Sequence, residues 1–243
     1  MLVAIHQPLY FPWLGYLDRM ARSDLFVVLD HVQFERRNYQ NRASILLEGQ
    51  PRWLTVPVIQ VSQKERILEK QVDNSAEGSR QWGPNHFKTL KYAYRKAPHF
   101  ECYAARLQDL LEARWESLLA LDLATLEFLR DAFEIRTPLR LSSQMQAEGA
   151  RSELLLNVCR SLGPGTTFLG GMGGSRHYLD KDAFASAGVG VQWQDFKHPV
   201  YAQCSGGAFT PGQTALDFLF NLGPFAAEYF HKAGDVERER IAA

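Results

Sequence analysis

The sequence predicts an α/β fold: a Rossmann-like, mostly parallel sheet with a helical insertion in the middle of the chain. Two short apolar runs near the amino end, Leu2 to Ile5 and Leu25 to Leu29, have the length and residue types of buried strands. Strand-like and helix-like segments then alternate, which is typical of a parallel sheet. Between Asn85 and Phe133 the apolar residues recur at spacings of three and four, which predicts helices alone.

The first half of the chain divides into elements by residue pattern. A helix is expected between the first two strands, and a hairpin follows where apolar runs flank a Glu-Gly-Gln-Pro turn. The helical middle should hold one helix that stops before Pro98 and two more that are separated by a break. These segments are Leu14 to Arg22, Ala43 to Val61, Asn85 to Ala97, and Phe100 to Phe133 with its break near Glu116 to Asp122.

The second half returns to alternating elements. A short strand is expected at Thr137 to Leu141, then a helix capped by Ser152 or a neighbour and ended by Gly163. The remaining helices are expected at Asp180 to Ala187, Thr214 to Asn221 and Pro224 to Lys232, and the strands or extended runs at Thr166 to Leu169, Val189 to Trp193 and His198 to Gln203.

Length and composition limit the classes of protein. The 243 residues suit a single domain over 1–243, with a helical subdomain over about 85–135 as the second option. Lys plus Arg and Asp plus Glu number 27 each, so no overall charge favours nucleic acid or an anionic membrane. No apolar stretch approaches the roughly 20 residues of a membrane span, and five residues before His6 are too few for a signal peptide. Three scattered cysteines fit a reducing compartment, so we expect a cytoplasmic protein.

Polar residues follow both amino-terminal strands at their carboxyl ends. His6 and Gln7 end the first strand, and Asp30 ends the second. Ligands of parallel α/β proteins bind at this edge of the sheet. His6 is a candidate general base, since an imidazole titrates near neutral pH. Asp30 can orient His6 or bind a hydroxyl or amine of a ligand. A purely structural role in the turn at the end of the strand is an equal alternative.

Two further groups lie in the same region, a basic loop and an aromatic group. The basic loop contains Arg36, Arg37, Asn38, Asn41 and Arg42, and the aromatic group contains Tyr10, Phe11, Trp13 and Tyr16. Arginine forks bind phosphate with paired hydrogen bonds, so the basic loop suits a nucleotide-sugar diphosphate, with a solvated loop paired to Glu35 as the alternative. The aromatic residues can stack on a base or a sugar ring, although core packing is the commoner role.

The second half offers a glycine-rich loop and a second histidine. The run Gly170 to Gly174 follows a strand and can cradle a phosphate or an acyl group, but it lacks the P-loop lysine. His198 can pair with His6 or bind substrate, and a nucleophilic Cys204 beside it is a weaker alternative. His177, His198, Asp180 and Asp195 lack the spacing of a metal site, so neither a metal nor a cofactor is expected.

The motifs themselves resemble those of the WbqC-like protein family. The resemblance begins with HQPxYxPWxGYxD from His6 to Asp18, and continues with Asp24, Asp30, Gln33, Phe34, Asn41 and Arg42. It extends through WLTVPV, KAPHF, FLGGMGG, Tyr178 to Asp180, HPVYAQ and LDFLFNLGP, and so covers nearly the whole chain. Gly170 departs from the pattern, because the family places Ser there.

The resemblance implies a role in surface-polysaccharide (O-antigen, lipopolysaccharide) or secondary-metabolite biosynthesis. The implied enzyme is a transferase that moves an acyl or aminoacyl group from a thioester, such as an acyl carrier protein, to a nucleotide-linked amino sugar. The alternatives are a non-catalytic nucleotide-sugar or glycan-binding module, and an accessory subunit of a glycosyltransferase or carrier protein. The expected catalytic residues are His6, Asp30 and His198; the expected substrate-binding residues are Gln7, Tyr10, Trp13, Tyr16, Asp18, Gln33, Arg36, Arg37, Asn41, Arg42, Gly171, Gly173, Gly174, Tyr178, Tyr201 and Gln203.

Overall fold

A five-stranded parallel sheet forms the centre of the protein. The structure, a computed structural model, describes residues 1–75, 81–171, 173 and 175–232. The sheet order is β5-β2-β1-β6-β7, and every neighbouring pair is parallel. Its strands are β1 (Leu2–His6), β2 (Leu25–Val28), β5 (Leu139–Leu141), β6 (Thr167–Gly170) and β7 (Gly190–Trp193). The chain adds strands on one side of β1 and then crosses to the other, so the order reverses between β1 and β6. The predicted Rossmann-like α/β class is confirmed.

Both faces of the sheet are covered, which explains why its central strands are apolar throughout. Val3 and Ile5 of β1 pack in one core with Leu154 and Val158 of α5. The alternate residues of β1 belong to the other core, which includes α1 and the helical middle of the chain. The helices on this framework are α1 (Leu14–Arg22), α5 (Arg151–Ser161), α6 (Ser175–Tyr178) and α7 (Lys181–Ser186).

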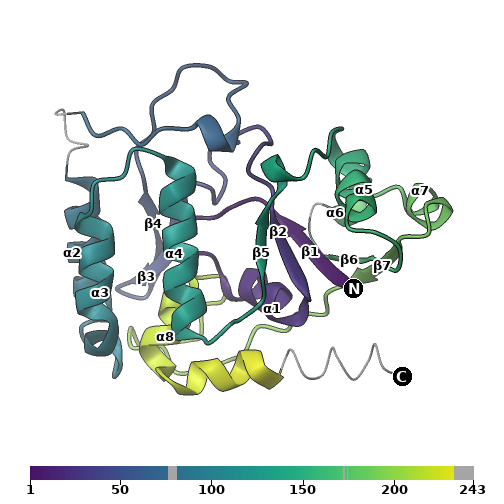
Figure 1. The fold of residues 1–243 in the computed structure, drawn as a ribbon. Coiled ribbons are helices and arrows are strands. Elements are labelled where there is room, and N and C mark those ends of the chain that lie inside the picture. Colours follow the sequence, from purple (N-terminus) through teal and green to yellow (C-terminus); the bar gives the residue numbers. More distant parts are fainter. Residues whose placement is uncertain (76–80, 172, 174, 233–243) are drawn as a thin grey trace.

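The helical insertion lies beside the sheet and adjoins a separate hairpin. Figure 1 shows the insertion and the hairpin on one side of β1 and β2, with α5 to α7 on the other. The insertion consists of α2 (Trp82–Tyr94), α3 (Phe100–Glu112) and α4 (Leu118–Ala132), and it packs with α8 (Ala215–Leu222). The hairpin pairs β3 (Arg42–Leu47) with β4 (Gln50–Thr55). The predicted break between two helices falls at residues 113–117, where the Ser117 hydroxyl caps α4.

The loop after β1 is fixed by this insertion. Phe11 has a φ of +41°, which a bulky residue adopts only under constraint. Its backbone N–H donates to the Thr125 hydroxyl of α4 at 3.2 Å. The Tyr10 hydroxyl bonds Nδ1 of His86 in α2 at 2.9 Å. The insertion therefore sets the course of the chain that leaves the sheet at His6.

Several local predictions differ from the structure. Ser152 does not cap α5, whose N-cap is Ala150; the Ser152 hydroxyl accepts the backbone N–H of Asp180 instead. The run at residues 198–203 was expected only to be extended; it belongs to no strand and lies along α8. The helix α6 was not expected, and two single 3₁₀ turns occur at Ile67–Glu69 and Ser142–Gln144. Residues 225–232 are helical, as predicted. No helix in the described ranges has the length and apolarity to cross a membrane.

Candidate functional site

A cavity of ≈ 600 Å³ opens where β1 and β6 end. Its position is the reversal point of the strand order, which is where open parallel sheets form a crevice for ligands. The volume lies within the range of small-molecule sites. The lining residues are Ile5, His6, Gln7, Leu9, Trp13, Arg19, Leu29, Glu35, Asn38, Tyr39, Leu155, Phe168, Gly171, Gly173, Tyr178, Gln194 and Phe196.

His6 presents a neutral imidazole to this cavity. Its Nδ1 lies 2.9 Å from the Gln7 carbonyl oxygen, which can only accept, so Nδ1 carries the proton and Nε2 is left as an acceptor. The Tyr16 ring meets the imidazole edge-on at 5.0 Å between centroids. Burial, and secondarily the charge of Arg19, lowers the pKa of His6 from 6.5 to about 3. The ring is therefore unprotonated at neutral pH.

Arg19 supplies a buried positive charge to the same cavity. The residue is only 5% exposed, and its Nε finds no hydrogen-bond partner within the described part of the chain. No carboxylate among the described residues forms an ion pair with it. Burial lowers the pKa of Arg19 from 12.5 to about 10, so the guanidinium keeps its charge at neutral pH. A buried cation without a carboxylate partner is costly, and a bound anion would offset that cost.

The backbone of Gly171 lies directly against this guanidinium. A Cβ at Gly171 would be 2.5 Å from Arg19 Nη1, which is closer than van der Waals contact. Only glycine therefore lets the loop after β6 approach the cation. Gly173 also lines the cavity, so the glycine-rich loop and Arg19 form one wall.

The neighbouring carboxylate of Asp18 is occupied by other groups. Arg22 donates to both of its oxygens, at 2.8 and 3.1 Å. Gln194 donates to Asp18 at 2.6 Å and to the Gly15 carbonyl at 2.9 Å, which ties the segment after β7 to α1. Asp18 thus fixes the helix that carries Arg19, and although its charge favours the cationic form of Arg19, the two form no direct ion pair.

The rim of the cavity carries an acidic and aromatic set. Glu35 accepts a hydrogen bond from the Asn38 amide at 2.8 Å and forms no ion pair with a described residue. Burial raises the pKa of Tyr178 on the same rim; the charge of Arg151 opposes this rise, and the charge of Glu35 adds to it. Tyr39 packs edge-on against the exposed ring of Trp53, at 5.3 Å between centroids.

Gln40 connects this rim to the end of β1. Its side-chain amide donates to Gln7 Oε1 at 2.8 Å, and its Oε1 accepts the backbone N–H of Glu35 at 2.9 Å. Gln40 itself is fully buried, and both bonds are partly buried. The loop after β2 is thereby held in a fixed position relative to His6.

The structure brings six of the expected site residues together in the cavity lining: His6, Gln7, Trp13, Gly171, Gly173 and Tyr178. Gly174 lies outside the described residues. Three other expected residues are structural neighbours of the site: Tyr16 packs on His6, Tyr10 holds His86, and Asp18 holds Arg22 and Gln194.

Asp30 and His198 do not line the cavity. The Asp30 carboxylate accepts hydrogen bonds from the hydroxyls of Ser142 and Ser143, at 2.9 and 2.6 Å, and so ties the end of β2 to the turn after β5. His198 bonds the Pro199 carbonyl oxygen and packs against the rings of Phe196 and Phe209. Of these neighbours, Phe196 reaches the cavity.

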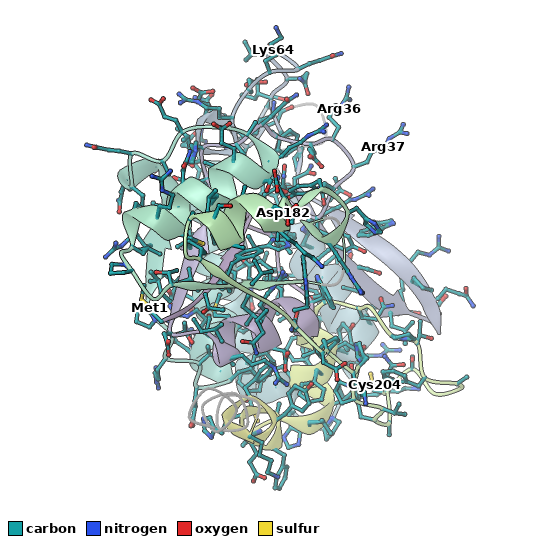
Figure 2. The ribbon with its side chains drawn as sticks, turned by 90° about the vertical axis from the view of Figure 1, so that its right-hand side faces the viewer. Met1, Arg36, Arg37, Lys64, Asp182 and Cys204 are labelled. Carbon is teal, nitrogen blue, oxygen red and sulfur yellow. The ribbon has the colours of Figure 1, made fainter. Side chains whose placement is uncertain are left out.

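The Tyr201 and Gln203 side chains belong to a buried network on α8. The Tyr201 hydroxyl and the Gln203 amide donate to Asp217, at 2.7 and 3.1 Å. Cys204 lies beside this network, and burial raises its thiol pKa, which disfavours a thiolate nucleophile. Figure 2 shows Cys204 toward the opposite end of the molecule from Arg36 and Arg37.

The arginines of the basic loop lie outside the cavity lining, whereas Asn38 of the same loop is part of it. The side chains of Arg36 and Arg37 extend outward from the body of the molecule (Figure 2). Arg42 stacks over Trp53, at 4.2 Å to the ring centroid, and donates to the Arg37 carbonyl. Asn41 donates to the Val56 carbonyl and Gln33 to the Gln63 carbonyl, so both amides brace loops.

Sequence reasoning missed four polar residues of the cavity: Arg19, Glu35, Tyr39 and Gln194. Arg19 looks like an exposed helix residue, because its neighbours Asp18 and Arg22 are also charged. The available signal is that α1 follows a buried strand and precedes another, so little of its surface can face water. Within the described residues, no group of three or more His, Cys, Asp and Glu side chains could hold a metal ion.

Comparison with known proteins places the chain in a family. Residues 7–229 match the WbqC-like protein family. The chain is also 33% identical over 229 residues to "Uncharacterized protein Rv1507c" of Mycobacterium tuberculosis (strain ATCC 25618 / H37Rv), a match that covers 93% of this chain and 96% of that protein. No solved structure matches the sequence. The family match begins at Gln7, so it includes every lining residue of the cavity except Ile5 and His6. The protein therefore belongs to the WbqC-like protein family.

Proposed function

We propose that this protein is a cytoplasmic transferase of surface-polysaccharide (O-antigen) or secondary-metabolite biosynthesis. It moves an acyl or aminoacyl group from a thioester donor to the amine of a nucleotide-linked amino sugar. The observation that carries the proposal is the pairing, in one cavity, of a neutral His6 with a buried Arg19 that has no carboxylate partner. The first can accept a proton, and the second can bind the phosphate of a nucleotide sugar.

The transfer step requires a base and a site for the oxyanion. The amine nitrogen attacks the thioester carbonyl, an N–C bond forms, and the C–S bond breaks. His6 Nε2 takes the proton of the attacking amine and returns it to the departing thiolate sulfur. Backbone N–H groups near Gly171 and Gly173 would hold the carbonyl oxygen as it becomes negative. The donor is a thioester of the kind carried by an acyl carrier protein.

Because of the charge of Arg19, the basicity of His6 depends on whether the substrate is bound. With the cavity empty, Arg19 helps to keep the pKa of His6 at about 3, which makes the imidazole a weak base. A phosphate bound to Arg19 would bring negative charge next to the ring and raise that pKa. The base would therefore gain strength when the nucleotide sugar is bound.

Turnover tests the proposal directly. The protein is incubated with acyl thioesters and uridine diphosphate amino sugars, and the amide product is detected by mass spectrometry. We expect His6→Gln to abolish product formation. His177→Gln is the matched control, because His177 is exposed and does not line the cavity. Equal turnover by the wild type and His6→Gln would refute the role of His6.

A non-catalytic nucleotide-sugar-binding module is the second candidate. The low pKa of His6 favours it, because an imidazole of that basicity is suited to accept a hydrogen bond from a ligand hydroxyl. This candidate predicts that nucleotide sugars bind to the wild type and that no acyl donor ever yields product. Calorimetric titration alongside the mass-spectrometric assay separates the two functions.

A further inference from the structure

The cavity carries opposite charges at two depths. Arg19 lies at its buried floor, and Glu35 lies at its exposed rim. Neither forms an ion pair with a described residue, so both charges are available to something that enters the cavity.

The floor is suited to an anionic group. The guanidinium of Arg19 is buried, its Nε has no partner within the described ranges, and the backbone of Gly171 lies against it. Asp18, the nearest carboxylate along the chain, is already bonded to Arg22 and Gln194. A carboxylate or phosphate of the ligand would supply the missing acceptors.

The rim is suited to a cationic group. One Glu35 oxygen accepts the Asn38 amide, so the carboxylate, which is part of the cavity lining, has further acceptor capacity. Gln40 holds the backbone of Glu35 and is itself bonded to Gln7 beside the base. The backbone of Glu35 is therefore tied to the end of β1 through Gln40 and Gln7, and its exposed side chain extends from this fixed point.

We propose that the cavity selects a ligand that bears both an anionic group and a primary ammonium group, with Arg19 binding the anion and Glu35 the ammonium. The inference deepens the proposed function and rests on it, because it identifies the acceptor as an amino sugar phosphate or diphosphate recognised through its free amine. Glu35 binds the ammonium form on entry; the ammonium then releases one proton to water, and the neutral amine that results attacks the thioester. A sugar with a hydroxyl in place of the amine lacks the charge that Glu35 attracts.

Matched ligands test this inference without any acyl donor. Glucosamine 6-phosphate, glucose 6-phosphate and glucosamine are titrated into the protein by calorimetry, at one ionic strength and pH. Uridine diphosphate glucosamine and uridine diphosphate glucose form a second pair, with the anion on the other end of the sugar. We expect the amine-bearing member of a phosphorylated pair to bind about fivefold more tightly than its hydroxyl counterpart. Glucosamine without phosphate should bind more weakly than the corresponding phosphate ester.

Glu35→Gln is the decisive variant, because it keeps the size of an exposed side chain and removes only its charge. We expect it to abolish the preference for the amine and to leave the affinity for the hydroxyl ligand unchanged. Arg19→Lys keeps the buried charge and should weaken the binding of the amine-bearing and hydroxyl-bearing phosphorylated ligands alike, because lysine lacks the planar guanidinium group. Arg37→Gln is a matched surface control that should change nothing.

Three results would overturn the inference: equal binding of the amine and hydroxyl ligands, an amine preference that persists in Glu35→Gln, or no binding by either phosphorylated pair. Failure of the proposed function leads to a different result. If the amine preference and its dependence on Glu35 are present while no acyl donor gives product, the transferase proposal fails and the recognition proposal stands.

Discussion

Replacing Arg19 with glutamine tests whether the charge of Arg19 lowers the basicity of His6. The buried guanidinium is the second-largest cause of the low His6 pKa, after burial of the ring itself. Glutamine keeps much of the side-chain volume and removes the charge. The basicity of His6 should therefore increase even though the ring stays where it is.

The structure sets the size of the effect. The pKa of His6 falls from 6.5 to about 3. A depression of that size corresponds to about 5 kcal/mol, at roughly 1.36 kcal/mol per unit. Burial is the larger cause and persists in Arg19→Gln, so the expected rise is on the order of 1 unit, which leaves the pKa below the value of a free imidazole.

Nuclear magnetic resonance of the ¹⁵N-labelled imidazole measures this pKa directly. The wild type, Arg19→Gln and the surface control Arg37→Gln are titrated from about pH 8 to the acid limit of folding. Inorganic phosphate added to the wild type should raise the His6 pKa in the same direction. An unchanged pKa in Arg19→Gln, or an equal change in Arg37→Gln, would refute the coupling of the two side chains.

Three further predictions concern stability. Because the folded-state pKa of His6 is about 3 and the unfolded value is 6.5, the unfolded chain binds the extra proton between them, and the free energy of unfolding falls as pH drops through that window. His6→Gln should remove about 3 kcal/mol of this acid destabilisation at about pH 4.5, as measured by urea denaturation, and an unchanged pH slope would contradict it. Gly170→Ser places a Cβ 2.6 Å from the Trp193 ring and should cost about 1–3 kcal/mol in thermal unfolding experiments, with Trp193→Leu restoring most of the loss. Burial raises the pKa of Asp122 well above 3.8, so the carboxyl stays protonated in the folded protein but releases its proton in the unfolded chain as pH rises. The stability advantage of Asp122→Asn over the wild type should therefore grow toward alkaline pH. An advantage that grows toward acid pH would refute this.

The periodicity of apolar residues and the residues that end helices and strands were sufficient to predict most of the fold. The runs Leu2 to Ile5 and Leu25 to Leu29 are apolar at every position because helices cover both faces of the sheet, and such runs are recognisable without a structure. The break between α3 and α4 was predicted near Glu116 to Asp122, and in the structure Ser117 caps α4 just there. The cap of α5 was predicted wrongly, since Ser152 has a long-range partner in Asp180. Sequence spacing carries no information on a bond of that kind.

The site could be predicted only in part. His6 and the glycine loop were found because both follow strands, and strand ends meet at one edge of a parallel sheet. Arg19 was missed because its burial depends on how α1 packs between the sheet and the segment after β7. The arginines of the basic loop were predicted to bind phosphate because they are close together in the sequence, but Arg36 and Arg37 are exposed. Local charge density does not indicate which cation is desolvated, and desolvation is what makes a single guanidinium effective.

A crystal structure with uridine diphosphate glucosamine tests the central claim most directly. The claim is that the cavity at the ends of β1 and β6 is the ligand site and that Arg19 is its anion-binding group. We predict that the diphosphate lies within hydrogen-bond distance of the Arg19 guanidinium and that the amine points to Glu35. A ligand bound against Arg36 and Arg37, with the cavity empty, would contradict the claim.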